Sequence, residues 1–125
     1  VGSPDIIGVA GGKLTLADLK TSVKPYCRWW PKDLEKGCQE WRDRLGGYMK
    51  FKKCLKQLGA YALGIEQTLN MKVDQAAIIV STPKDTQLFK ISRRHLNYAQ
   101  DDWLKVVAEY YKQISNCVVY DADNI

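Results

Sequence analysis

Residues 4–22 read PDIIGVAGGKLTLADLKTS, with an apolar segment on each side of Gly11-Gly12. A glycine pair suits a two-residue hairpin turn, because both central positions of a type I′ turn need positive φ. The pattern therefore predicts antiparallel strands over 4–10 and 13–20, joined by a tight turn.

Pairing across this turn places Asp5 opposite Asp18 and Ile7 opposite Leu16. Counted outward from the turn, the aspartates form a non-hydrogen-bonded pair, whose Cβ atoms approach to about 4.5–5.5 Å. Strand alternation also puts Lys20 on the face of Asp18. Facing carboxylates repel each other unless a cation lies between them, and oxygen ligands suit Mg²⁺ or Mn²⁺. The hairpin therefore predicts a metal site; the alternative is that both acids face solvent, or that Lys20 neutralises one of them.

The middle of the chain predicts two helices separated by a glycine pair. A loop is expected over 21–31 and a short helix over 32–45, which Gly46-Gly47 ends. Residues 48–69 have the periodicity of an amphipathic helix. The apolar stripe of that helix comprises Phe51, Leu55, Leu58, Ala62, Ile65 and Leu69.

The last third of the chain predicts two strands and a closing helix. Residues 73–82 are typical of a buried strand, and 86–91 of a second strand after a proline-containing turn. Ser92 suits the N-cap of a helix that reaches about Ser115, and His95 is expected to cap or pack near its start. The apolar side of this helix comprises Leu96, Trp103, Val107, Tyr110 and Ile114.

Together these elements predict a single α/β domain over 1–125, with a central mixed sheet flanked by helices and a polar tail at 116–125. A chain of 125 residues is long enough to bury its own core. Neither a membrane-spanning run nor a signal peptide is visible, so we expect an intracellular protein without a membrane partner. The cysteines lack metal-ligand spacing and are expected to be buried or half-buried thiols. They are Cys27, Cys38, Cys54 and Cys117.

Positive charge is concentrated in one part of the chain. The net charge is +5, whereas residues 20–56 hold eleven basic and four acidic residues. Such a block favours a polyanionic partner, although a solvated lysine-rich helix face has the same composition.

Aromatic and basic residues alternate in an arm over about 26–53, as in surfaces that stack single-stranded bases; the alternative places its tryptophans in the core. The expected nucleic-acid-binding residues are Thr21, Ser22, Lys24, Tyr26, Arg28, Trp29, Trp30, Arg42, Arg44, Lys50 and Lys53.

Gln57 and Tyr61 add polar groups to one helix face. They are four residues apart and so share a face, which Lys50 and Lys53 continue toward the N-terminus. This row lies beside the apolar stripe and can border the same cleft as the carboxylates. The alternative is an ordinary helix flank.

Three motifs follow one another on a strand, a strand and a helix. They are Gly2-Ser3-Pro4-Asp5, Asp18-Leu19-Lys20-Thr21 and Gln57-Leu58-Gly59-Ala60-Tyr61. With these motifs, residues 2–115 resemble the PD-(D/E)XK nuclease superfamily, and in particular its RecB-like branch, which includes exonucleases of mitochondrial genome maintenance and of phages. The resemblance implies a restriction-endonuclease-like core.

The resemblance also implies an activity, the metal-dependent hydrolysis of DNA from its ends or on single strands. The implied ligands of Mg²⁺ or Mn²⁺ are Asp5, Asp18 and the Leu19 main-chain carbonyl. Lys20 would position and polarise the attacking water, while Gln57 and Tyr61 would orient the phosphate or Lys20. The implied location is the cytoplasm of a bacterium, that of a phage host, or the mitochondrial matrix.

Two alternatives stay open. The first is an endonuclease of the same superfamily, and the second is a catalytically incomplete subunit that binds nucleic acid. The second alternative arises because the upstream helical part of the RecB-like branch, which adds a Glu or His to the metal site, is not seen before the first strand. A partner chain or an upstream segment would then complete the site.

Overall fold

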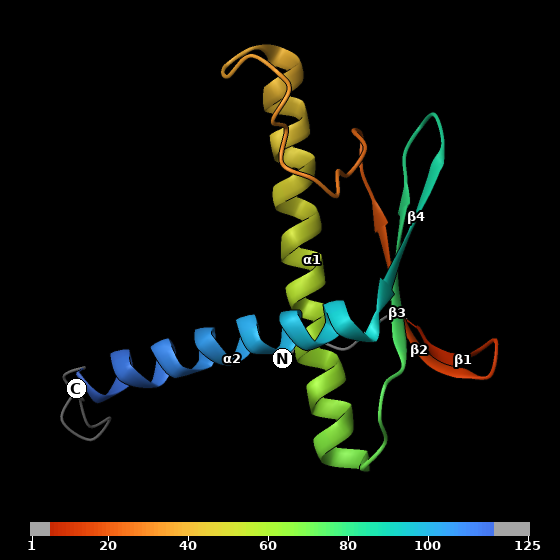
Figure 1. The fold of residues 1–125 in the computed structure, drawn as a ribbon, viewed down its shortest axis with the longest axis vertical. Helices are drawn as coiled ribbons and strands as arrows, with labels where there is room; N and C mark the ends of the chain where they lie inside the picture. Colours follow the sequence, from red (N-terminus) through yellow and green to blue (C-terminus); the bar gives the residue numbers. More distant parts are fainter. Residues whose placement is uncertain (1–5, 117–125) are drawn as a thin grey trace, which may run out of the picture.

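A computed structural model describes residues 6–116, which form one four-stranded sheet with two helices on the same side of it (Figure 1). In chain order the elements are β1 (Ile6–Ala10), β2 (Lys13–Thr21), α1 (Gln39–Leu69), β3 (Gln75–Ser81), β4 (Thr86–Ser92) and α2 (Arg93–Ser115). The strand order is β1-β2-β3-β4, in which β2 and β3 are parallel and the other neighbours are antiparallel. The predicted α/β class, the mixed sheet and the order of elements are confirmed.

The Gly11-Gly12 turn forms as predicted, with φ of +57° and +76°. β1 and β2 pair in the predicted register along the whole of β1, including Ile7 opposite Leu16. Asp5 lies outside the described residues, so its pairing with Asp18 stays a prediction.

Parallel pairing of β2 with β3 requires the chain to cross over the sheet. Residues 22–38, which we call the crossing segment, and α1 make that connection (Figure 1). α1 packs on the inward-facing residues of β2 and β3. The largest fully buried side chains are Leu16, Leu58, Val73, Ile78, Val80, Ile91 and Leu96.

α1 runs without interruption through Gly46-Gly47, so the predicted break at this pair and the separate helix over 32–45 are wrong. The helix starts only after Cys38, whose Sγ accepts a hydrogen bond from Trp41 N at 3.4 Å. Gly47 instead allows the crossing segment to pack closely on α1, because a Cβ there would lie 2.5 Å from Pro25 O of that segment. Leu69, expected on the buried stripe, is exposed in the last turn.

α2 begins as predicted, since Ser92 Oγ accepts a hydrogen bond from His95 N at 3.4 Å and lies 2.9 Å from its Nδ1. The helix then projects away from the sheet (Figure 1). Tyr110 and Ile114, predicted to lie on its apolar side, are therefore largely exposed. Within residues 6–116, neither helix carries an apolar run that would bridge a bilayer.

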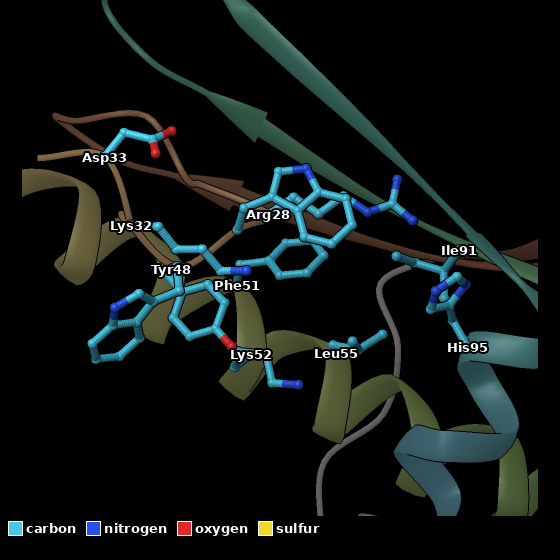
Figure 2. Close-up of a pocket in the computed structure, with 11 residues that line it drawn as sticks. Arg28, Lys32, Asp33, Tyr48, Phe51, Lys52, Leu55, Ile91 and His95 are labelled. Carbon is cyan, nitrogen blue, oxygen red and sulfur yellow. The ribbon is translucent and has the colours of Figure 1, made fainter.

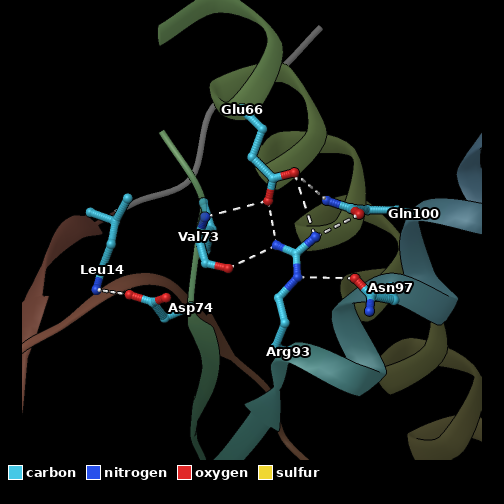
Figure 3. A network of polar contacts seen from close by, with 7 residues as sticks. All are labelled: Leu14, Glu66, Val73, Asp74, Arg93, Asn97 and Gln100. Atoms are coloured by element: carbon cyan, nitrogen blue, oxygen red, sulfur yellow. Dashed lines mark hydrogen bonds and ion pairs between the residues drawn. The ribbon is translucent and has the colours of Figure 1, made fainter. Parts of the chain in front are cut away.

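A polar cluster joins α1, β3 and α2 (Figure 3). Arg93 forms an ion pair with Glu66 and donates to Val73 O at 2.8 Å and to Gln100 Oε1 at 3.1 Å. Its Nε also donates to Asn97 Oδ1 at 3.0 Å. One guanidinium thus connects the end of α1, the entry to β3 and the start of α2.

Candidate active site

Asp18 is a charged residue in the core, with only 4% of its surface exposed. Strand alternation turns Leu16, Asp18 and Lys20 toward α1. The carboxylate receives a hydrogen bond from Cys54 Sγ at 3.1 Å, and Lys20 Nζ lies 3.2 Å away. Both contacts are made to Oδ2, and Oδ1 makes no hydrogen bond to the described residues.

Lys20 connects this carboxylate to solvent, because 35% of its side chain is exposed. Burial alone lowers the pKa of Lys20. The hydrogen bond and Coulombic attraction to Asp18, with smaller contributions from Cys54 and Tyr26, outweigh burial and raise the pKa above its ordinary 10.5. Lys20 is therefore an ammonium ion at neutral pH and cannot serve there as a general base.

Tyr26 is buried beside this group, although it was expected on a nucleic-acid-binding surface. Its main chain is held by Gln87 of β4, which accepts from Tyr26 N at 2.8 Å and donates to Tyr26 O at 3.0 Å. Burial raises the pKa of Tyr26, Coulombic interactions with Cys54 and Asp18 raise it further, and the interaction with Lys20 lowers it. The phenol is thus neutral at physiological pH and within electrostatic reach of the Asp18–Lys20 pair.

Gln57 and Tyr61 lie on the face of α1 that carries Cys54, at the i+3 and i+7 positions. Both are half-buried, and Tyr61 packs against the core. Among residues 6–116, neither side chain forms a hydrogen bond to Asp18 or Lys20. They border the predicted site without touching it.

The predicted metal ligands are only partly described. Asp5 lies outside the described residues, and within 6–116 no group of three or more His, Cys, Asp or Glu side chains is arranged to hold a metal ion. Leu19 turns its side chain to the sheet face that carries neither α1 nor α2, where it is half-exposed. The role of its main-chain carbonyl stays a prediction.

Several of the expected nucleic-acid-binding residues make contacts within the protein instead. Lys24 forms an ion pair with Asp43, and Arg44 forms one with Glu40 at 3.1 Å. Ser22 Oγ donates to Lys24 O at 2.6 Å. The remaining polar members outside the groove described next are exposed. They are Thr21, Arg42, Lys50 and Lys53.

A groove of about 590 Å³ opens between the crossing segment, α1 and the first turn of α2 (Figure 2). We call it the aromatic groove. It is lined by Arg28, Trp29, Trp30, Lys32, Asp33, Tyr48, Phe51, Lys52, Leu55, Ile91 and His95. Trp29 and Trp30 are 75% and 48% exposed, so the alternative that places them in the core is wrong.

Three groove residues that surround these tryptophans were not predicted from the sequence to bind nucleic acid. They are Lys32, Tyr48 and His95. Tyr48, Lys52 and Leu55 form an i, i+4, i+7 row, a signal that could have shown their common face. Lys52 and Cys54 are two positions apart, about 200° around the helix. The aromatic groove and Asp18 therefore adjoin different faces of α1.

Comparison with known proteins leaves the family open. A scan against protein-family models and a search of curated proteins find no match to this chain. Its function has to be inferred from the residues themselves.

Proposed function

We propose that the chain is a metal-dependent deoxyribonuclease of the PD-(D/E)XK superfamily, which hydrolyses phosphodiester bonds at DNA ends or in single strands. One observation carries the proposal. A buried carboxylate, Asp18, lies 3.2 Å from the partly exposed ammonium of Lys20, two residues further along β2. The hairpin before this strand, and the helix that covers it with Gln57 and Tyr61 on the flank, add support.

The chemistry of Asp18 fits a hard cation. Its Oδ2 is engaged by Lys20 and Cys54, which leaves Oδ1 for a ligand. Mg²⁺ and Mn²⁺ take oxygen ligands, so Asp18 would hold the ion together with the Leu19 carbonyl and Asp5. When bound, such an ion lowers the pKa of a water molecule and stabilises charge on the phosphate.

Lys20 has an electrostatic role in this proposal. Its raised pKa keeps it charged, so that it donates hydrogen bonds and polarises a water or a phosphate oxygen instead of taking a proton. Asp18 holds the ammonium in place at 3.2 Å. Gln57 and Tyr61, on the same face of α1 as Cys54, border the site and orient the phosphate.

The direct test is a cleavage time course on end-labelled, linear single-stranded DNA, with Mg²⁺, Mn²⁺ or EDTA. Asp18→Asn should lower the rate by about a hundredfold or more, because it removes a charge from the reacting site. Asp101→Asn, on the exposed side of α2, is the matched control. Circular dichroism checks that both variants are folded. Equal rates for Asp18→Asn and the wild type would overturn the proposal.

Circular substrates separate the two nuclease alternatives. An exonuclease leaves closed single-stranded circles intact while it degrades the same sequence after linearisation. An endonuclease of the same superfamily opens the circles at a comparable rate.

A second candidate is a subunit that binds nucleic acid without cleaving it. It is favoured because residues 6–116 hold no group of three or more His, Cys, Asp or Glu side chains arranged for a metal ion. Leu19, Ile79 and Leu88 also lie side by side on the sheet face that carries no described helix, as a surface for a completing partner would. Binding of single strands with no metal-dependent cleavage by the 125-residue chain would favour this candidate.

A further inference from the structure

We infer that the aromatic groove binds a short segment of single-stranded nucleic acid, with bases against Trp29 and Trp30 and phosphates against Arg28, Lys32 and Lys52. The inference deepens the proposed function, on which its choice of ligand rests, by naming the surface that holds the strand. The volume of about 590 Å³ is in the range of ligand sites, roughly 300–1,000 Å³.

The cations of the groove are available to a ligand. Arg28, Lys32 and Lys52 make no ion pair with a carboxylate among residues 6–116, whereas nearby Lys24 and Arg44 do. Asp33 supplies the one carboxylate of the described lining. A concave surface with this excess of positive charge attracts a phosphate backbone.

The aromatic side chains are exposed yet held in place. Trp30 meets Tyr48 edge to face with ring centroids 5.8 Å apart, and the guanidinium of Arg28 lies 5.6 Å from the centroid of Trp29. Large exposed aromatic rings beside cations are typical of surfaces that stack unpaired bases, at about 1–3 kcal/mol per base. In a duplex the base faces are already stacked on each other, so the groove favours single strands.

The crossing segment, which forms one side of the groove, is anchored to both β4 and α1. Tyr26 is fixed to β4 through both hydrogen bonds to Gln87, and Gly47 lets the segment lie directly on α1. Phe51 and Leu55 of α1 form the apolar floor of the groove, between the crossing segment and the first turn of α2 (Figure 2). A preformed site loses little conformational entropy when it binds.

The test is fluorescence anisotropy with a labelled oligothymidylate in EDTA, where no metal-dependent cleavage occurs. Trp29→Ala should weaken binding about tenfold, since a lost stacking contact of about 1.4 kcal/mol corresponds to that factor. Tyr111→Ala, an exposed aromatic residue on α2, should leave affinity unchanged. The logarithm of the binding constant falls linearly with the logarithm of the salt concentration. Lys52→Ala should make this slope less steep by about 0.7, whereas Lys105→Ala on α2 should leave it unchanged.

The inference is overturned if Trp29→Ala and Tyr111→Ala bind alike, or if a duplex of the same sequence binds as tightly as the single strand. An oligouridylate arm shows whether RNA or DNA is preferred, and tight binding of either supports the groove. Binding is measured without metal and cleavage with it. A failure of strand binding at the groove can therefore be distinguished from a failure of cleavage at Asp18.

Discussion

The Cys54 thiol of α1 donates a hydrogen bond to Asp18 Oδ2 of β2 across 3.1 Å, in a position where Cys54 itself is 2% exposed. This contact attaches the crossover helix to the strand that carries the candidate site. Cys54 thus contacts the same carboxylate oxygen as the partly exposed Lys20, whose Nζ lies 3.2 Å away. The orientation of Asp18 is thus set by two elements that are distant in sequence.

Removing the Cys54 donor should destabilise the fold. Cys54→Ala deletes a buried hydrogen bond to a charged group, so the free energy of unfolding should fall by about 1–3 kcal/mol. Cys54→Ser retains a hydrogen-bond donor, so its free energy of unfolding should fall by less. Cys27→Ala, at a half-buried thiol of the crossing segment, is the control. Urea unfolding measures all three, and equal stability of Cys54→Ala and the wild type would show that the contact contributes nothing.

The Asp18–Lys20 pair should make stability depend on alkaline pH. The pKa of Lys20 is raised in the folded state, so the stabilisation is fully present below the ordinary value of 10.5 and is lost as pH rises through the higher folded value. The raised pKa of Tyr26 acts in the same direction. Thermal unfolding midpoints between about pH 9 and 11.5 should therefore fall less steeply for Lys20→Gln than for the wild type. Lys90→Gln should follow the wild type, and identical slopes for all three proteins would contradict this.

The glycine pair within α1 should respond to alanine in opposite directions. At Gly46 a Cβ meets nothing within 4 Å, so Gly46→Ala should stabilise the protein by about 0.5–1 kcal/mol through helix propensity. At Gly47 the same atom would lie 2.5 Å from Pro25 O and 3.1 Å from Cys27 N. Gly47→Ala should therefore destabilise by about 1–3 kcal/mol as the crossing segment moves away. Chemical denaturation measures the pair, and a stabilising Gly47→Ala would show that the segment does not rest on α1.

The guanidinium of Arg93 should contribute far more to the stability of the fold than that of Arg94. Arg93→Ala leaves the partly buried Glu66 carboxylate without its counter-ion, although Val73 N and Gln100 still donate to it, and we expect a loss of about 2–3 kcal/mol. Arg94→Ala removes an exposed side chain and should change stability by no more than about 0.5 kcal/mol. Guanidinium chloride would mask the ion pair, so urea is the denaturant to use. Similar losses for the two variants would indicate that the polar cluster is not cooperative.

Local signals in the sequence were sufficient for much of the fold. The Gly11-Gly12 turn determines the hairpin register because positive φ at two successive positions is almost confined to glycine there. Ser92 marks the start of α2 because its hydroxyl meets a main-chain N–H of the first turn. The turn and the cap depend only on residues that are adjacent in the chain, so the sequence is sufficient to predict them.

The glycine pair at the middle of α1 shows where local reasoning fails. Gly46-Gly47 has the composition of a helix break, and isolated peptides would support that interpretation. Packing against the core along the rest of α1 outweighs the low helix propensity, and the crossing segment requires the missing side chain at Gly47. The decisive contact is with Pro25, which is distant in the sequence.

Part of the candidate site could likewise be predicted from local sequence, and part could not. The sequence by itself determined that Asp18 and Lys20 share the inward face of β2, because strand alternation depends only on their spacing. Only the tertiary structure decided that Cys54 holds the carboxylate, that Tyr26 is buried beside it, and that Tyr48 and Lys52 join the tryptophans on another face of α1. The physical reason is that these contacts follow from how the crossover packs on the sheet, and packing between distant segments is absent from any local pattern.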